Sequence, residues 1–201
     1  MNKRFQWQQI QTEYREVRPS KHADELRWIV NRETILEMTT GDIIARGIMR
    51  HPGICVMVPF LDADRILLMR QYRCAANDSI WELPAGTLSG RFEAGRVHPI
   101  EPPESCARRE LLEETGYEAA ELEKVCECYT MPGTSDEIMN VFFERRLLKR
   151  ERSLDVGEVI DELRPVRLSE TSAMIGRGEI RDAKTLVGLF HALRHTSNSG
   201  R

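Results

Sequence analysis

Hydrophobic residues gather in two neighbouring runs in the first half of the chain. These runs are Ile54–Phe60 and Arg65–Gln71, and the short segment Leu61–Asp64 separates them. Apolar runs of this length with a short polar connection predict a β-hairpin. A further short strand is predicted at Ile80–Leu83, and Pro84-Ala85-Gly86 ends it. The pattern therefore predicts strands along most of this stretch.

The first 50 residues carry a weaker pattern. Residues 1 to about 22 are polar, and we expect them to be loosely held. The segments that read as strands or turns are Glu25–Val30, Ile35–Met38 and Ile43–Met49, with Thr40-Gly41-Asp42 as a turn. Their hydrophobic content is thin for an independent core. We therefore expect residues 1–50 to form a small N-terminal β subdomain that dimerises, and residues 51–197 to form the main domain.

One helix is predicted near the middle of the chain. Residues 87–101 hold two glycines and a proline without a clear period, which predicts a loop before it. Pro102-Pro103-Glu104 then begins the helix, because proline suits the first turn and an acidic residue complements the positive helix end. Gly116 is a natural stop. We expect a helix over residues 102–115.

The rest of the chain alternates between strand and helix patterns. Strands are predicted at 118–128, 137–144 and Leu163–Leu168, with an acidic loop at 150–162. Two C-terminal helices are predicted at Ser169–Arg177 and Asp182–His195, with Ser169 and Asp182 as N-caps. This order predicts an α+β fold, an α/β/α sandwich with a mixed β-sheet between helices.

Composition and charge exclude several classes of protein. The hydrophobic share is 41%, the charged share is 30% and the net charge is −3, so no broad positive field favours nucleic acid or an anionic membrane surface. We find no signal peptide and no apolar run that could span a membrane, so we expect a cytoplasmic protein. The five cysteines contain no C-x-x-C pair, which favours free thiols over a zinc site.

Three glutamates on the predicted helix are the strongest candidates for chemistry. Glu110 and Glu114 are four residues apart and therefore stack on one helix face, with Glu113 beside them. Such carboxylates repel one another unless a cation lies between them, and oxygen ligands suit Mg2+ or Mn2+. Arg109 can pair with Glu113. The alternative is an ordinary solvated acidic face.

The wider spacing carries a resemblance to a family. The segment Gly95-x5-Glu101-x7-Arg109-Glu110-Leu111-x-Glu113-Glu114-x-Gly116-Tyr117 resembles the Nudix box, G-x5-E-x7-R-E-U-x-E-E-x-G-U. Every fixed residue type is present, and Tyr117 fills a position that is usually aliphatic. The segments that look like the ADP-ribose pyrophosphatase branch of this family are His51-Pro52-Gly53, Arg70-Gln71-Tyr72-Arg73 and Trp81-Glu82-Leu83-Pro84-Ala85-Gly86.

One departure from this branch concerns the first glycine of the box. In the branch this glycine directly follows Pro-Ala, and here that residue is Gly86, nine residues before Gly95. Either Gly95 takes the role, or Gly86 does and an insertion precedes Glu101. We favour Gly86, because it lies where a strand ends.

The resemblance implies roles for the glutamates. Similar enzymes bind metal ions with residues that match Glu110 and Glu114, with help from Glu113 and from the backbone carbonyl of Ala85. Glu101 supports the site, and Arg109 holds Glu113 in place. The base that activates water commonly comes from a later loop, where the candidates are Glu158, Asp161 and Glu162, and we favour Glu162. For each of these three residues, the alternative is an ordinary acidic loop residue without a catalytic role.

A second segment resembles the substrate signature of the branch. In Pro132-Gly133-Thr134-Ser135-Asp136-Glu137, a Pro-Gly turn exposes N–H groups, and Ser135 and Glu137 can bond sugar hydroxyls. A plain turn between strands is the alternative. Arg73 is a candidate phosphate clamp, with a surface salt bridge as the alternative, and Gly86 and Gly133 are further candidate contacts. Trp28 and Arg46 could touch the base across a dimer, but for Trp28 we favour the alternative of buried packing.

These expectations converge on one activity. The resemblance implies Mg2+-dependent hydrolysis of a nucleotide-sugar diphosphate, with ADP-ribose as the substrate, AMP and ribose 5-phosphate as products, and a homodimer as the assembly. A GDP-mannose or other nucleotide-sugar pyrophosphatase is the nearest alternative. A non-catalytic ADP-ribose sensor is the alternative from another class, and the complete set of helix glutamates argues against it.

Overall fold

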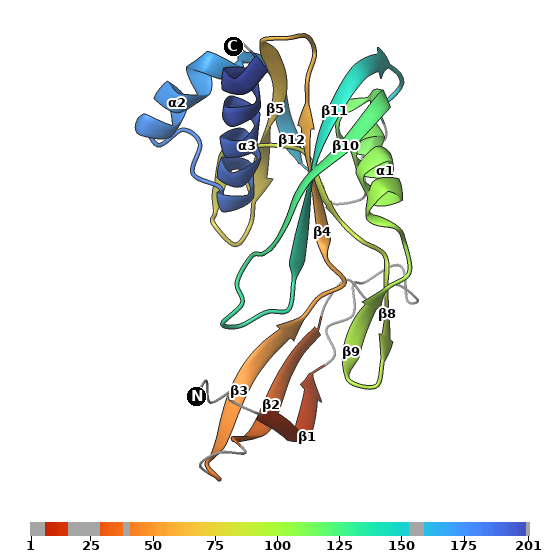
Figure 1. Ribbon diagram of the computed structural model, residues 1–201, viewed down its shortest axis with the longest axis vertical. Helices are drawn as coiled ribbons and strands as arrows, with labels where there is room; N and C mark the ends of the chain where they lie inside the picture. Colours follow the sequence, from red (N-terminus) through yellow and green to blue (C-terminus); the bar gives the residue numbers. More distant parts are fainter. Residues whose placement is uncertain (1–6, 16–28, 38–40, 153–158, 200–201) are drawn as a thin grey trace. The chain divides into compact units, whose positions relative to one another are not determined.

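The computed structural model describes residues 7–15, 29–37, 41–152 and 159–199 of the chain (Figure 1). The chain divides into two compact units. The first unit comprises residues 1–53, 88–101 and 129–138, and the second comprises 54–87, 102–128 and 139–201. Two segments from the middle of the sequence therefore belong to the same unit as the N-terminal strands.

The first unit consists of antiparallel strands. Its three-stranded sheet has the order β1-β2-β3, formed by β1 (Trp7–Arg15), β2 (Ile29–Glu37) and β3 (Ile43–Arg50). The expectation that residues 1–22 are loosely held was wrong for residues 7–15. Their ladder with β2 runs from Trp7 opposite Glu37 to Arg15 opposite Val30. Backbone pairing of this kind satisfies N–H and C=O groups even where few side chains are apolar, so hydrophobic patterning missed it. Of the predicted strand at 25–30, only residues 29 and 30 lie within the described residues.

A hairpin replaces the loop predicted at residues 87–101. Strands β8 (Gly90–Glu93) and β9 (Arg96–Pro99) pair in the register Glu93 opposite Arg96. The two residues between them, Ala94 and Gly95, both have positive φ angles, of 50° and 82°. Two-residue turns of this kind match the twist of a hairpin, and glycine adopts the required conformation readily. Gly95 is therefore a turn residue of this hairpin.

The second unit is the predicted sandwich. One sheet has the order β10-β11-β4-β7, with β10 (Tyr117–Tyr129), β11 (Ile138–Lys149), β4 (Ile54–Pro59) and β7 (Ala85–Thr87). The other has the order β12-β5-β6, with β12 (Ile160–Arg167), β5 (Arg65–Arg73) and β6 (Asp78–Glu82). β11 and β4 are parallel while β4 and β7 are antiparallel, which confirms a mixed sheet.

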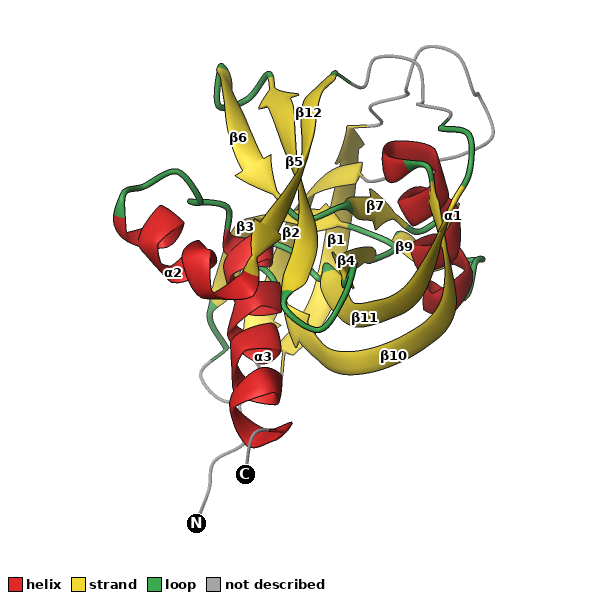
Figure 2. Ribbon diagram, turned by 90° about the horizontal axis from the view of Figure 1, so that it is seen from above, coloured by secondary structure: helices red, strands yellow, loops and turns green. Residues whose placement is uncertain are grey.

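Three helices cover the strands of this unit. α1 (Pro103–Thr115) lies on one side, and α2 (Leu168–Gly176) and α3 (Ala183–Ser199) lie on the other (Figures 1 and 2). Gly116 ends α1 in the left-handed conformation, as predicted. The predicted N-cap Asp182 accepts the backbone N–H of Thr185, whereas Ser169 is not a cap, since α2 already begins at Leu168. None of the described helices combines the length and low polarity that crossing a membrane requires.

The predicted hairpin between residues 54 and 71 was wrong. β4 and β5 belong to different sheets, and a single antiparallel bridge joins Phe60 to Ile66. The reason is competition for strand edges: β11 and β7 occupy both edges of β4, and β12 and β6 occupy both edges of β5. Adjacent strands in the sequence separate when other strands pair with both.

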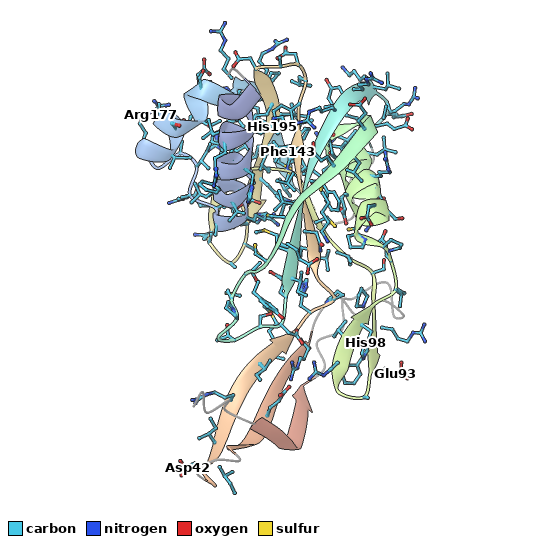
Figure 3. The ribbon with its side chains drawn as sticks, viewed as in Figure 1. Asp42, Glu93, His98, Phe143, Arg177 and His195 are labelled. Atoms are coloured by element: carbon cyan, nitrogen blue, oxygen red, sulfur yellow. The ribbon has the colours of Figure 1, made fainter. Side chains whose placement is uncertain are left out.

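The main core lies on the α3 side of β4. Val56 and Val58 pack there with Leu189 and Ala192 of α3. Phe143 makes edge contacts with the rings of Phe60 and His195, and Figure 3 labels Phe143 and His195 near each other. The neighbouring residues of β4 face α1, where the Cys55 thiol donates to the carbonyl of Pro103. Helices on both sides explain why β4 reads as an uninterrupted apolar run.

One of the buried carboxyl groups of the second unit lacks a hydrogen-bond partner among the described residues. Glu144 on β11 is 0% exposed, and its two carboxyl oxygens have no hydrogen-bond partner among the described residues. Burial raises the pKa of Glu144 well above its usual value, and the charge of Arg108 opposes this only in part. Burial without a hydrogen-bond partner therefore favours the neutral, protonated form of Glu144 in the folded protein.

We predict that Glu144→Gln is increasingly stabilising, relative to the native chain, as pH rises. The unfolded chain releases this proton near pH 4.5 while the folded chain retains it, so native stability falls as pH rises from there towards the folded pKa. Within that window the difference grows by about 1.4 kcal/mol per pH unit. Urea unfolding at pH 5 to 8 measures it. Glu127→Gln, at an exposed partner of Lys124, is the control, and a difference that does not vary with pH would contradict the prediction.

Candidate active site

The helix α1, which belongs to the second unit, carries two buried glutamates. Glu110 is 7% exposed and Glu114 is 1% exposed. Their spacing of four residues places them on one helix face, as the sequence predicted. A solvated acidic face would leave both side chains exposed, so burial decides against that alternative. Two carboxylates at this depth require compensation from neighbouring groups.

The backbone of β7 lies directly against these two side chains. The N–H of Ala85 donates to Oε2 of Glu114 at 2.9 Å. A Cβ atom placed on Gly86 would lie 1.9 Å from Cδ of Glu110. Only glycine leaves room for the Glu110 carboxylate at this position. The contact supports Gly86, rather than Gly95, as the glycine that accompanies the glutamates of α1.

Arg109 compensates the charge of the glutamates. Its Nη1 donates to Oε1 of Glu110 at 2.8 Å and to Oε2 of Glu113 at 3.0 Å. The predicted pairing with Glu113 is confirmed, and the bond to Glu110 was not foreseen. Among the described residues, no three carboxylate, histidine or cysteine side chains converge closely enough to hold a metal ion. Glu110 and Glu113 instead share Nη1 of Arg109 as a partner.

The donor set still fits a hard divalent cation. Glu110 and Glu114 offer carboxylate oxygens beside the backbone of Ala85, and Mg2+ and Mn2+ bind through oxygen ligands. A cation here would compete with Arg109 for Glu110, because both are drawn to the same carboxylate. The residues that would hold it are therefore Glu110 and Glu114 with the backbone of Ala85.

Arg73 lies at the end of β5 and is already paired. Its Nε and Nη2 donate to the two carboxyl oxygens of Glu82 at 2.9 and 2.6 Å. The hydrogen-bonded Glu82 raises the pKa of Arg73, and the charges of Glu114 and Asp182 act in the same direction. Arg73 is thus fully charged, and the charge of Glu114 on α1 acts on it. Its predicted role as a phosphate clamp stays a prediction.

Sequence reasoning assigned no role to Glu82. This residue is 0% exposed, and Lys184 of α3 also donates to it. The sequence did hold a clue, since Glu82 lies near the end of a predicted strand and is followed directly by the apolar Leu83, which is buried. A carboxylate buried at such a place needs a positively charged partner. Its two partners come from residues 73 and 184, which no local pattern connects.

The segment at residues 131–137 forms a turn within the first unit. The hydroxyl of Ser135 donates to the carbonyl of Met49 and accepts the N–H of Glu137, and Ser135 is 5% exposed. Gly133 has open space around it. The plain-turn alternative is therefore supported for Ser135, whose hydroxyl makes its bonds internally. Contacts of these residues with a sugar stay predictions.

Glu137 pairs with a histidine that the sequence left unassigned. Nδ1 of His51 accepts the N–H of Gly53, and its Nε2 lies 3.3 Å from Oε2 of Glu137. Burial lowers the pKa of His51, although the charges of Glu137 and Asp136 oppose this. The neutral ring then carries its proton on Nε2, directed at the carboxylate. Glu137 is oriented by this contact.

The remaining candidates occupy separate places. Glu101 accepts the N–H of Ser89 within the first unit. Glu162 lies opposite Arg70 in the ladder of β12 with β5. Because side chains alternate along a strand, Glu162 lies on the sheet face opposite to that of Arg73. Its assignment as the base gains no support from this register and stays a prediction. Arg46 is exposed on β3, while Trp28 and Glu158 lie outside the described residues.

Comparison with known proteins gives a consistent picture. The NUDIX domain family matches residues 49–187, which is more than half of the chain. An ADP-ribose pyrophosphatase of Bacillus subtilis (strain 168) is 38% identical over 156 residues, covering 77% of this chain and 79% of the relative. A GDP-mannose pyrophosphatase of Citrobacter koseri is 33% identical over 147 residues, covering 69% and 71%.

A solved structure shares the fold. It is described as the crystal structure of an ADP compounds hydrolase, and it superposes with a TM-score of 0.76 over 100% of both chains. The sequence identity is 20%, so this likeness bears on architecture alone. It agrees with the layered arrangement of strands and helices expected from the sequence.

We predict that Gly86→Ala weakens binding of a divalent cation at least about tenfold, since a Cβ atom would displace the Glu110 carboxylate. Calorimetric titration with Mn2+ measures this effect. Gly176→Ala is a matched control in the same unit, because a Cβ atom there meets nothing within 4 Å. Equal affinity in Gly86→Ala and the native protein would remove Glu110 from the cation site.

Proposed function

This chain belongs to the NUDIX domain family, and from that premise we propose that it hydrolyses the diphosphate of a nucleoside diphosphate-sugar. The proposed substrate is ADP-ribose, and the products are AMP and ribose 5-phosphate. The observation that carries the proposal is the buried pair Glu110 and Glu114 against the backbone of Ala85 and Gly86. The Bacillus subtilis relative named as an ADP-ribose pyrophosphatase supports the choice of sugar nucleotide.

The proposed mechanism divides the work among residues of this chain. Glu110 and Glu114 hold Mg2+, with the carbonyl of Ala85 as a further ligand. When bound, the cation neutralises phosphate oxygens and lowers the pKa of water. With a cation on Glu110, Arg109 would give up its bond to that carboxylate and keep its bond to Glu113, which would hold Glu113 beside the two ligands.

Other residues have proposed roles in binding and proton transfer. Arg73 is the proposed phosphate clamp, which attracts and binds the diphosphate of the substrate. Glu162 accepts the proton of the attacking water. The residues proposed to support the site or to contact substrate are Glu101, Gly86, Gly133, Ser135 and Glu137.

Two alternatives differ in substrate or in class. Hydrolysis of GDP-mannose is favoured by the Citrobacter koseri relative, since the same glutamates can serve either substrate. An ADP-ribose sensor without catalysis is disfavoured, because burying Glu110 and Glu114 costs free energy that a binding module has no reason to spend.

The proposal extends to assembly and location. We propose a homodimer in which the N-terminal β subdomain of residues 1–50 makes the contact, with no nucleic acid partner. Mg2+ is the proposed physiological cation, and Mn2+ is a substitute of similar ligand preference. A cytoplasmic location agrees with the five cysteines, whose described side chains form no disulfide.

A substrate panel tests the proposed function. ADP-ribose, ADP-glucose, GDP-mannose, NADH and diadenosine polyphosphates are incubated with Mg2+, and phosphate-containing products are identified. We expect ADP-ribose to give the highest kcat/KM, with AMP and ribose 5-phosphate released together. A preference for GDP-mannose would select the alternative substrate, and turnover of no diphosphate would refute the hydrolase.

Glu114→Gln tests the proposed role of the buried pair. We expect kcat to fall by about two orders of magnitude or more, because a neutral amide binds a divalent cation poorly. The metal-free melting temperature should stay unchanged or rise, since a carboxylate repulsion is removed while the amide oxygen still accepts the N–H of Ala85. Glu104→Gln, exposed on the same helix, serves as the control. Full activity in Glu114→Gln would exclude this residue from the mechanism.

A further inference from the structure

A second cluster of charges lies in the unit that contains the catalytic helix. At its centre is Glu82, the last residue of β6, and around it are Arg73, Lys184 and Asp182; we call this set the Glu82 cluster. Glu82 is 0% exposed, so its charge must be compensated from within the protein. None of the roles described above uses Lys184.

The two cations of the cluster share one carboxylate. Arg73 bonds both oxygens of Glu82, and Nζ of Lys184 bonds Oε2, the same oxygen that Nη2 of Arg73 contacts. The side chain of Arg73 is 38% exposed, whereas that of Lys184 is 16% exposed. Arg73 can therefore reach a ligand in solution, while Lys184 is committed to the carboxylates beside it.

The start of α3 fixes Lys184 in this position. Asp182 lies 3.0 Å from Nζ of Lys184 and also accepts the N–H and the hydroxyl of Thr185. The hydroxyl oxygen of Thr185 in turn accepts the N–H of Leu83. These bonds attach the first turn of α3 to the residue that follows Glu82, directly before the Pro84-Ala85-Gly86 segment.

The charge balance shows what Lys184 contributes. If Arg73 were the only partner of Glu82, the carboxylate would cancel most of the positive potential of the guanidinium. Lys184 offsets part of the negative charge of Glu82. Arg73 is therefore still oriented by its bonds to Glu82, and its guanidinium attracts an anion more strongly than it would without Lys184. The charge of Glu114 acts on Arg73, so this potential is expressed near the catalytic helix.

We propose that Lys184 is a positioning residue that acts through Glu82 to keep Arg73 available to the diphosphate of the substrate. This inference rests on the proposed function and adds to it a residue from the C-terminal helix. Lys184 does not contact the substrate; its effect passes through the carboxylate that it shares with Arg73.

If Lys184 only linked α3 to β6, removing another ion pair between the same elements should have the same effect on KM. The ion pair of Arg181 with Asp78 also links the beginning of α3 to β6, but both of its side chains are about half exposed, at 56% and 47%. Arg181→Gln therefore removes a comparable link without changing the charge on Glu82. It is the matched control for Lys184→Met.

The test compares steady-state kinetics of the full-length variants with ADP-ribose and Mg2+. We expect Lys184→Met to raise KM about tenfold with kcat within about twofold of the native value, since ground-state attraction of the diphosphate is lost. Lys184→Arg should bring KM back close to the native value, and Arg181→Gln should leave both KM and kcat unchanged. An unchanged KM in Lys184→Met, or an equal rise in Arg181→Gln, would overturn the inference.

A double-mutant cycle with Glu82→Gln tests the route of the effect. Because Lys184 acts mainly through Glu82, Lys184→Met should raise KM much less when Glu82 is already neutral, and Asp182 is then the carboxylate that remains beside Lys184. The same tenfold rise in that background would overturn the positioning role. Should the native protein hydrolyse no diphosphate, the proposed function fails, and equilibrium binding of ADP-ribose decides the inference: weaker binding in Lys184→Met supports it, and unchanged or absent binding refutes it.

Discussion

The contact between the Glu110 carboxylate and the backbone of Gly86 is the constraint on which the candidate site depends. A side chain at position 86 would occupy the space of the carboxylate, so the helix and β7 can meet only where the strand carries glycine. The pairing of Cys55 with Gly86 fixes β7 on β4. The N–H of Ala85 then reaches Glu114 at 2.9 Å, and both acidic side chains are withdrawn from solvent.

Burial of acidic groups recurs through both units, and the chain compensates it in distinct ways. Arg109 neutralises the exposed side of Glu110, and Arg73 and Lys184 together neutralise Glu82. In the first unit Arg50 bonds the buried Glu33 and also Asp136. These ion pairs orient cations as well as carboxylates, and orientation is what binding of an anionic ligand requires. The compensation and the proposed chemistry therefore use the same residues.

The first unit shows that a motif and its structural use can differ. The turn at residues 131–137 reads as a substrate signature, yet the Ser135 hydroxyl makes both of its bonds inside the protein. Asp136 accepts the N–H of His51 and bonds Arg50, which ties the turn to the end of β3. Because Ser135 and Asp136 use their side chains to hold the turn, the turn's backbone and Glu137 are the groups that could face a ligand.

The sequence by itself predicted a helix over residues 102–115, which the structure has at 103–115, together with its terminal Gly116. It also predicted the stacking of Glu110 with Glu114, because helical geometry relates residues three and four positions apart. It also determined the layered α/β/α architecture through the order of its elements. The contact with Glu110 supports Gly86, which the sequence already favoured over Gly95. Tertiary structure alone decided that β4 and β5 enter different sheets and that Lys184 reaches Glu82. Each of these depends on which strand edges and which buried charges find partners far along the chain, and no local period records that choice.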